Sequence, residues 1–230
     1  MVRATHHGRV FEMTKVGTQG TSPRFRLSIC AAADLDEYCY RGVTHILSID
    51  SPEFTTPTPD WFSGVHKNVF FHDVLSRAEA DALSAREPTA AIIREVLEYG
   101  RECLIESRAG PTHLIIHCTY GASRSPAAAY AILCLWLGKD REVQAKDLLL
   151  RIRPEAVPNI LVIAYADKLL RREGKMVEAI QALNDQLIEE MKEGYRVQGT
   201  RLKVQGAGQR ERSRRSEIRR QNRLIRELEN

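Results

Sequence analysis

Long apolar runs are missing from the 230-residue sequence. The longest, from Pro126 to Leu137, falls well short of the roughly 20 residues that cross a bilayer, so we expect no membrane span. The first 24 residues are polar and also lack the apolar stretch of about 7 to 15 residues found in a secretory signal. We therefore expect residues 1–24 to form a flexible leader and the protein to be cytoplasmic.

Paired cysteines are missing as well. The five cysteines are an odd number and include no CxxC spacing, which argues against a disulfide framework and against a zinc site. Reduced, buried cysteine behaves as a small apolar residue, so four of the five are expected to fill the core. These four are Cys30, Cys39, Cys103 and Cys134.

A net positive charge is missing outside the C-terminal end. Residues 196–230 hold 11 Lys/Arg and 4 Asp/Glu, a net of +7, so residues 1–195 carry −3 of the total of +4. Four glycines within residues 194–209 indicate a linker, and the charged sequence that follows indicates a helix. We expect residues 194–230 to be a linker and basic helical tail, which could contact acidic partners or nucleic acid.

Short apolar runs bounded by turn residues alternate with longer segments of helical period. The runs predict strands at residues 26–30, 44–49, 68–73 and 113–118. Helices are predicted at residues 32–40, 88–107, 126–137 and 140–152 and from residue 160 onward, continued beyond Gly174 by Met176, Ile180, Leu183, Leu187 and Met191. This alternation predicts an α/β fold over residues 25–193, with a central, mostly parallel sheet of four to five strands flanked by helices.

The stretch HLIIHCTYGASRSP joins a predicted buried strand to a predicted helix through a short loop. A loop of this size at a helix N-terminus directs several backbone N–H groups to one point, where the helix dipole adds partial positive charge. Gly121 permits the turn that a side chain would obstruct. The sequence therefore predicts a phosphate-binding loop composed of Thr119, Tyr120, Gly121, Ala122, Ser123 and Arg124.

Cys118 begins this loop and is the candidate nucleophile. Free cysteine is mostly protonated at neutral pH, but a helix N-terminus and a neighbouring cation favour the reactive thiolate. Arg124 offers a planar fork that can bind two phosphoryl oxygens at once. Ser125 places a hydroxyl near the sulfur, where it would stabilise the departing thiolate. His117 points to the opposite face of the strand, so we expect it to orient the loop and not to act as a base.

HCTYGASRSP resembles the HCxxGxSRS signature of dual-specificity protein tyrosine phosphatases at every fixed position. The likeness extends from about Arg26 to about Leu183 and includes RPEAVPNI, which is similar to the Arg-Pro…Pro-Asn turn of that family. The resemblance implies that Asn159 caps a helix and braces the loop. An N-cap next to proline, without a role in the loop, would give the same pattern. With ADKLLRREGKMVEAI, the pattern looks closest to a bacterial branch. The resemblance implies hydrolysis of phosphate monoesters through a cysteinyl phosphate, with no metal or cofactor.

The resemblance also implies a general acid, an aspartate on a loop upstream of the nucleophile and after a strand. Asp73, at the end of NVFFHD, matches this placement, but it lies 45 residues before Cys118, farther than in compact members of the family. Asp81 is the second candidate, and Glu79 and Glu87 are more remote ones.

The substrate class stays open at this point. No motif resembles the deep phosphotyrosine-recognition loop of the larger enzymes, which favours a shallow pocket for phosphotyrosine and for phosphoserine or phosphothreonine in a phosphoprotein or phosphopeptide. The loop contains no lysine, unlike that of related phosphoinositide phosphatases. An RNA 5′-phosphatase would use the basic tail, but no aromatic residue follows Tyr195 to stack on bases. A non-catalytic phospho-binding module would be expected to lack the nucleophile, the arginine or the acid.

Overall fold

A computed structural model describes residues 10–14 and 24–183 of the chain. Its strands are β1 (Val10–Thr14), β2 (Arg24–Ala31), β3 (His45–Asp50), β4 (Val65–Phe70) and β5 (Thr112–Cys118). Its helices are the 3₁₀ helix η1 (Ala32–Tyr38), α1 (Arg77–Leu83), α2 (Ala90–Glu106), α3 (Arg124–Leu137), α4 (Glu142–Ile152) and α5 (Ile160–Leu170). Residues 175–183 are also helical.

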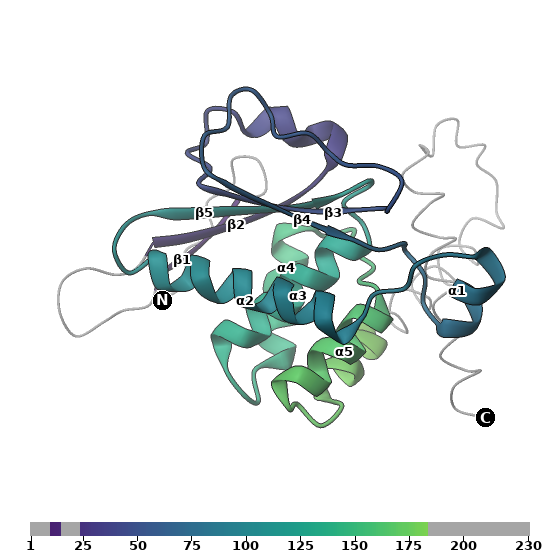
Figure 1. Ribbon diagram of the computed structural model, residues 1–230. Coiled ribbons are helices and arrows are strands. Elements are labelled where there is room, and N and C mark those ends of the chain that lie inside the picture. The colour runs from purple at the N-terminus through teal and green to yellow at the C-terminus, as the bar shows by residue number, and fades with distance from the viewer. Residues whose placement is uncertain (1–9, 15–23, 184–230) are drawn as a thin grey trace, which may run out of the picture.

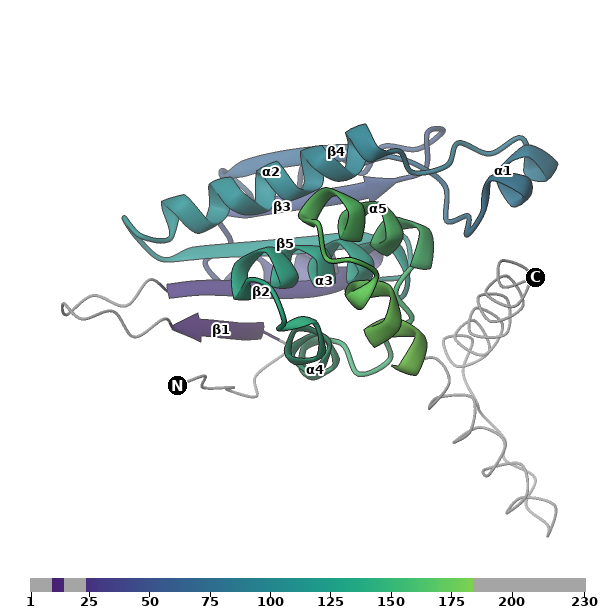
Figure 2. The same ribbon diagram turned by 90° about the horizontal axis from the view of Figure 1, so that it is seen from below.

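The five strands form one sheet in the order β1-β2-β5-β3-β4. β2, β5, β3 and β4 are parallel, and β1 pairs antiparallel with β2 at one edge. Helices α2 to α5 cover one face, whereas η1 and the connection from β3 to β4 lie on the other (Figures 1 and 2). The predicted α/β class and the mostly parallel sheet are therefore confirmed.

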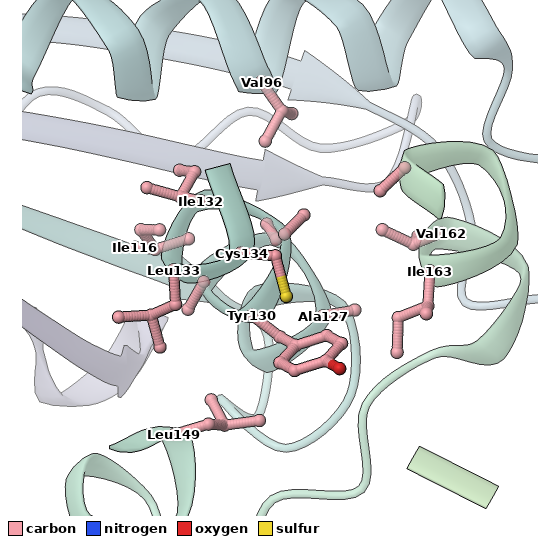
Figure 3. Close-up of a cluster of buried hydrophobic side chains, with 14 of the residues drawn as sticks. Val96, Ile116, Ala127, Tyr130, Ile132, Leu133, Cys134, Leu149, Val162 and Ile163 are labelled. Carbon is pink, nitrogen blue, oxygen red and sulfur yellow. The ribbon is translucent and has the colours of Figure 1, made fainter. Parts of the chain in front are cut away.

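The largest core lies between the sheet and its helices, and α3 is at its centre. Every residue of α3 from Arg124 to Cys134 is buried, as expected for a helix that is apolar nearly all round. Figure 3 shows Tyr130 and Cys134 of α3 surrounded by Val96 of α2, Leu149 of α4 and Ile163 of α5. Because α3 is packed on all sides, its N-terminus and the loop before it are held firmly against the sheet.

The parallel arrangement fixes where a site can form. Ile49 of β3 and Ala31 of β2 both lie opposite Cys118 in the register, so the carboxyl ends of these strands meet at one edge of the sheet. The loops that leave this edge carry the residues singled out by the sequence. In open α/β sheets, this edge is where ligands bind.

Several elements differ from the prediction. Residues 10–14, placed in the flexible leader, form the edge strand β1. The third predicted strand, residues 68–73, is instead Val65–Phe70, so Asp73 lies in the following loop and does not end a strand. The helix expected at residues 32–40 is 3₁₀ in form and ends at Tyr38.

Helix α1 was not predicted, because its seven residues bury only Ala80 and therefore show no apolar period. It accounts for part of the extra length between Asp73 and Cys118, and it lies beyond the end of the sheet, apart from the other helices (Figures 1 and 2). A capping signal was present in the sequence: the Ser76 hydroxyl accepts a hydrogen bond from the backbone N–H of Glu79.

The predictions for the C-terminal part of the chain can be compared with the structure only up to residue 183. The predicted linker and basic tail, residues 194–230, lie outside the described residues, as do Leu187 and Met191. Met176, Ile180 and Leu183, which continue the helical series beyond Gly174, are buried. Within the described ranges, no helix has the length and apolar character needed to span a bilayer.

Candidate active site

The candidate site is the loop between the end of β5 and the start of α3. Cys118 is the last residue of β5 and only 2% exposed, and Arg124 is the first residue of α3. The first N–H groups of a helix have no acceptor within the helix, so the N-terminus of α3 supplies donors at this point. The strand, loop and helix thus bring Cys118 and Arg124 to the same end of the sheet.

The hydroxyl group of Ser125 lies next to the thiol of Cys118. The Ser125 side chain donates a hydrogen bond to Cys118 Sγ over 3.2 Å, and both residues are buried. This hydroxyl stabilises negative charge on the sulfur. Cys103 and Cys134 are also buried, and burial is the main cause that raises the pKa of each to about 12.

The Arg124 side chain is held by three segments of the chain. Its Nη1 donates to the Phe71 carbonyl oxygen at 3.0 Å and to Ser51 Oγ at 3.3 Å, and its Nη2 donates to Thr119 Oγ1 at 2.9 Å. Arg124 is 5% exposed, and its Nε has no hydrogen-bond partner among the described residues. Three segments therefore fix the guanidinium beside the loop: the end of β3, the end of β4 and the loop itself.

The loop backbone is braced from outside. The Gly121 φ of +64° lies in the left-handed region, and a Cβ built there would lie 2.6 Å from the backbone carbonyl of Cys30. The backbone N–H of Val157 donates to the Ala122 carbonyl at 2.8 Å, and Arg153 Nη2 donates to the Tyr120 carbonyl at 3.3 Å. Only glycine fits this turn, and the segment after α4 holds its outer side.

The side chains of the loop differ in exposure. Thr119 and Tyr120 are exposed, Tyr120 to 71%, and Ala122 is half-buried. Ser123 is buried, and its hydroxyl donates to Asp73 Oδ1 at 2.8 Å. The mouth of the loop is therefore formed by Thr119 and Tyr120, while Ser123 joins the loop to Asp73.

Asp73 is joined to the site a second time, by Asn159. The fully buried Asn159 caps α5, because its Oδ1 accepts from the N–H groups of Leu161 and Val162 at 3.0 and 3.1 Å. This orients the amide so that Nδ2 donates to Asp73 Oδ1 at 2.8 Å and to the Val74 carbonyl at 3.0 Å. Asn159 thus combines an N-cap with a brace on the candidate acid.

The other candidate acids lie on or beside α1. Arg77 pairs with Asp81 at 3.2 Å and with Glu87 at 2.8 Å, and Asp81 is exposed. Glu79 accepts from the backbone N–H of Leu75 at 2.8 Å. Asp73 is the candidate whose hydrogen bond to Ser123 reaches the loop between Cys118 and Arg124.

His117 faces away from the thiol. Its Nε2 lies 2.5 Å from Ser48 Oγ on β3, which is also 2.6 Å from His66 Nε2, and His66 Nδ1 lies 2.7 Å from Thr58 Oγ1. Burial lowers the His117 pKa to about 4, so its ring is neutral at physiological pH. His117 is therefore tied to the neighbouring strand beneath the loop.

Solved structures that resemble this fold include dual-specificity and tyrosine phosphatases. Human DUSP28 has 21% identity over 68% of this chain and 94% of its own, with a TM-score of 0.48. Tk-PTP in its active form has 21% identity over 65% and 92% with a TM-score of 0.45, and PTPMT1 in complex with PI(5)P has 12% over 64% and 90%, also with 0.45. No protein-family model and no curated protein matches the sequence. At these identities and scores, the likeness is one of fold and adds nothing on activity; the bacterial branch stays a prediction.

Several residues of the site were not found from the sequence. Ser51 touches Arg124, Ser48 touches His117, and Arg153 touches the loop carbonyl of Tyr120. Arg153 begins the quoted RPEAVPNI turn, so a signal existed for it. The two serines carry no local pattern, because they reach the site only through the pairing of β3 with β5.

Proposed function

We propose that the protein is a phosphatase that hydrolyses phosphate monoesters through a cysteinyl-phosphate intermediate. The observation that carries the proposal is the 3.2 Å hydrogen bond from Ser125 Oγ to Cys118 Sγ, at the point where α3 begins with Arg124. A thiolate, a fixed cation and a helix N-terminus at one point can both bind a phosphoryl group and attack it.

In the first step, Cys118 Sγ attacks phosphorus and the bond to the ester oxygen breaks. Asp73 gives its proton to that oxygen, so the leaving group departs as a neutral alcohol or phenol. Arg124 and the N–H groups of the loop stabilise the charge that develops on the phosphoryl oxygens.

In the second step, water attacks phosphorus while the Asp73 carboxylate takes a proton from it. The bond between sulfur and phosphorus breaks, and orthophosphate leaves. Ser125 stabilises the sulfur as it regains negative charge, because its hydroxyl already points at Sγ. Every group in both steps belongs to this chain, the substrate or water.

For the substrate, we propose phosphotyrosine, with phosphoserine and phosphothreonine admitted to the same pocket. Two features support this: the loop has no lysine, and the exposed Tyr120 offers a ring beside the phosphate site. Exposed basic side chains would be expected in the loop itself if the substrate were a polyanionic lipid or RNA, whereas its exposed side chains are Thr119 and Tyr120. The partner is accordingly proposed to be a phosphoprotein or phosphopeptide.

The test is hydrolysis of phenyl phosphate, an aryl phosphate with a poor leaving group, by the wild type and by Cys118→Ser, Asp73→Asn and Asp81→Asn. We expect Cys118→Ser to be inactive and Asp73→Asn to lose about 100-fold in kcat, with Asp81→Asn as the matched control near wild type. Activity that survives Cys118→Ser would contradict the mechanism. If Asp81→Asn lost the activity and Asp73→Asn kept it, the acid would be misassigned.

A second set of substrates tests the class. The wild type should hydrolyse phosphotyrosyl peptides with a higher kcat/KM than a phosphoinositide or an RNA bearing a 5′-triphosphate. The chain truncated after residue 195 should hydrolyse the peptides with the same kcat/KM as the wild type. Faster turnover of the lipid or of the RNA would replace the proposed substrate while leaving the cysteine chemistry intact.

A further inference from the structure

His72, the neighbour of Asp73 in the chain, joins three separate loops. Its backbone N–H donates to the Arg86 carbonyl at 2.8 Å, and its ring Nδ1 lies 2.8 Å from the backbone N–H of Arg86. Its Nε2 lies 3.0 Å from Glu53 Oε2, in the loop that follows β3. Nothing in the sequence singled out this histidine.

These contacts determine the tautomer of the ring. A backbone N–H can only donate, so Nδ1 of His72 accepts from Arg86 and carries no proton. Nε2 of the neutral ring then carries the proton and donates it to the Glu53 carboxylate. Both ring nitrogens are therefore in use, each toward a different segment.

The segment at residues 71–73 is fixed on three sides by consecutive residues. The Phe71 carbonyl accepts from Arg124, the His72 ring bridges Arg86 and Glu53, and Asp73 accepts from Ser123. Arg124 and Ser123 belong to the phosphate loop, whereas Arg86 lies between α1 and α2 and Glu53 lies in the loop that follows β3. The His72 ring thus attaches the segment that carries the candidate acid to two segments other than the phosphate loop.

We propose that His72 is a positioning residue that holds Asp73 where it can deliver its proton to the leaving oxygen. The inference rests on the proposed phosphatase activity and adds to it a residue that touches neither substrate nor phosphorus. Ser123 and Asn159 hold the Asp73 carboxylate, and the contacts of His72 hold the backbone of the same segment.

The dependence of the rate on the leaving group of the ester distinguishes a role of His72 in positioning Asp73 from a merely structural role. An ester with a poor leaving group, such as phenyl phosphate, needs the proton from Asp73, and an ester with a good one, such as p-nitrophenyl phosphate, needs it far less. The kcat/KM for phenyl phosphate divided by that for p-nitrophenyl phosphate is a ratio that does not depend on how much of the enzyme is folded. A displaced Arg124 would lower both values together, whereas a displaced Asp73 lowers the ratio.

The experiment compares this ratio in the wild type, His72→Phe and His72→Asn. His72→Phe keeps a ring without nitrogen, and the ratio should fall about tenfold, a part of the roughly 100-fold that a general acid contributes. The Oδ1 of asparagine can accept from the Arg86 N–H in place of Nδ1, so His72→Asn should recover most of the ratio.

The control is His45→Asn. His45 lies at the amino-terminal end of β3, opposite the end where the site lies, and, like His72, is close to a glutamate, with its Nε2 3.2 Å from Glu106 Oε2. Its ratio should equal that of the wild type, even if its stability falls. An unchanged ratio in His72→Phe, with wild-type hydrolysis intact, would overturn the inference alone. A wild type without hydrolysis that depends on Cys118 would overturn the proposed function and the inference with it.

Discussion

The hydroxyl of Ser123 donates to Oδ1 of Asp73 over 2.8 Å and so joins the phosphate loop to the loop that follows β4. Asn159 reaches the same oxygen at 2.8 Å while its own carbonyl caps α5. The candidate acid is therefore fixed by the loop that holds the nucleophile and by the first turn of a core helix. The position of the Asp73 carboxylate therefore depends on both the phosphate loop and helix α5.

We expect Ser123→Ala to lower kcat for phenyl phosphate about tenfold, because Asp73 then keeps only its bond from Asn159 of these two. The lost hydrogen bond should lower the free energy of unfolding by about 1 kcal/mol, measured by urea denaturation.

Ser107→Ala is the matched control for Ser123→Ala. Ser107 is also buried and donates one hydrogen bond, to the Leu104 carbonyl at 2.7 Å, at the end of α2. It should lose similar stability and keep its kcat. Equal losses of kcat in both variants would contradict a specific role for Ser123.

Gly121→Ala should damage the loop itself. Its Cβ would lie 2.6 Å from the Cys30 carbonyl, and the positive φ disfavours any side chain. Because a shift of about 1 Å can cost about 100-fold in rate, we expect a loss of that order in kcat/KM.

Gly110→Ala provides the comparison for Gly121→Ala, since a Cβ built at Gly110 meets no atom within 4 Å. Its activity and its melting temperature should match the wild type within about 2 °C. An active Gly121→Ala would show that the loop can relax and that the close approach to β2 is unimportant.

How far the sequence predicted the site depends on how local each part is. Cys118, the loop and Arg124 are contiguous, and a buried strand and an apolar helix flank them, so period and motif placed all of them together. Asp73 was placed by the resemblance, which implies an aspartate on a loop after a strand, and its distance of 45 residues from Cys118 counted against it. The strand before it begins and ends three residues earlier than predicted, because NVFFHD continues the apolar run beyond Phe70.

The remaining parts depend on tertiary contacts. His72 reaches Glu53 only when the loops after β3 and β4 come together, and Ser51 reaches Arg124 only because β3 pairs with β5. No residue near either one in the sequence marks these contacts. Helix α1 buries a single side chain, so periodicity carried no information on it, although its Ser76 cap did. Edge strand β1 has five residues and pairs with one neighbour, which gives it little sequence signal.

Arg124→Lys should lose most of the activity even though the charge is kept. The guanidinium bonds Phe71, Ser51 and Thr119 through two nitrogens, whereas an ammonium group is a single point of donation. Loss of a charged hydrogen bond costs about 1.5 to 3 kcal/mol, so we expect kcat/KM to fall about 10- to 100-fold and inorganic phosphate to inhibit more weakly.

Arg26→Lys is the control for charge retention at a different site. Arg26 Nη2 donates to the Gly42 carbonyl at 3.3 Å and lies on β2. It should keep its kcat/KM within about twofold. If Arg124→Lys were as active as Arg26→Lys, bidentate binding of the phosphoryl group would be excluded.

Stability should fall on acidification because two histidines are buried in the neutral form. Burial is the main cause that lowers the pKa of His113 to about 4 and that of His117 to about 4, against about 6.5 in an unfolded chain. Between these values the unfolded chain binds more protons than the folded protein. The free energy of unfolding is therefore highest above about pH 6.5 and falls as the pH drops toward 4. By pH 5 each histidine should cost about 2 kcal/mol.

His113→Gln tests this contribution away from the site. The His113 ring lies between Ser28 Oγ and the Arg41 carbonyl, and glutamine can retain one of these hydrogen bonds without titrating. Urea denaturation at pH 7 and pH 5 should show that the variant loses about 2 kcal/mol less than the wild type over this interval. Its kcat at pH 7 should be unchanged, since the ring lies at the start of β5. An equal loss in both proteins would mean that His113 is protonated in the folded state at pH 5, against the effect of its burial.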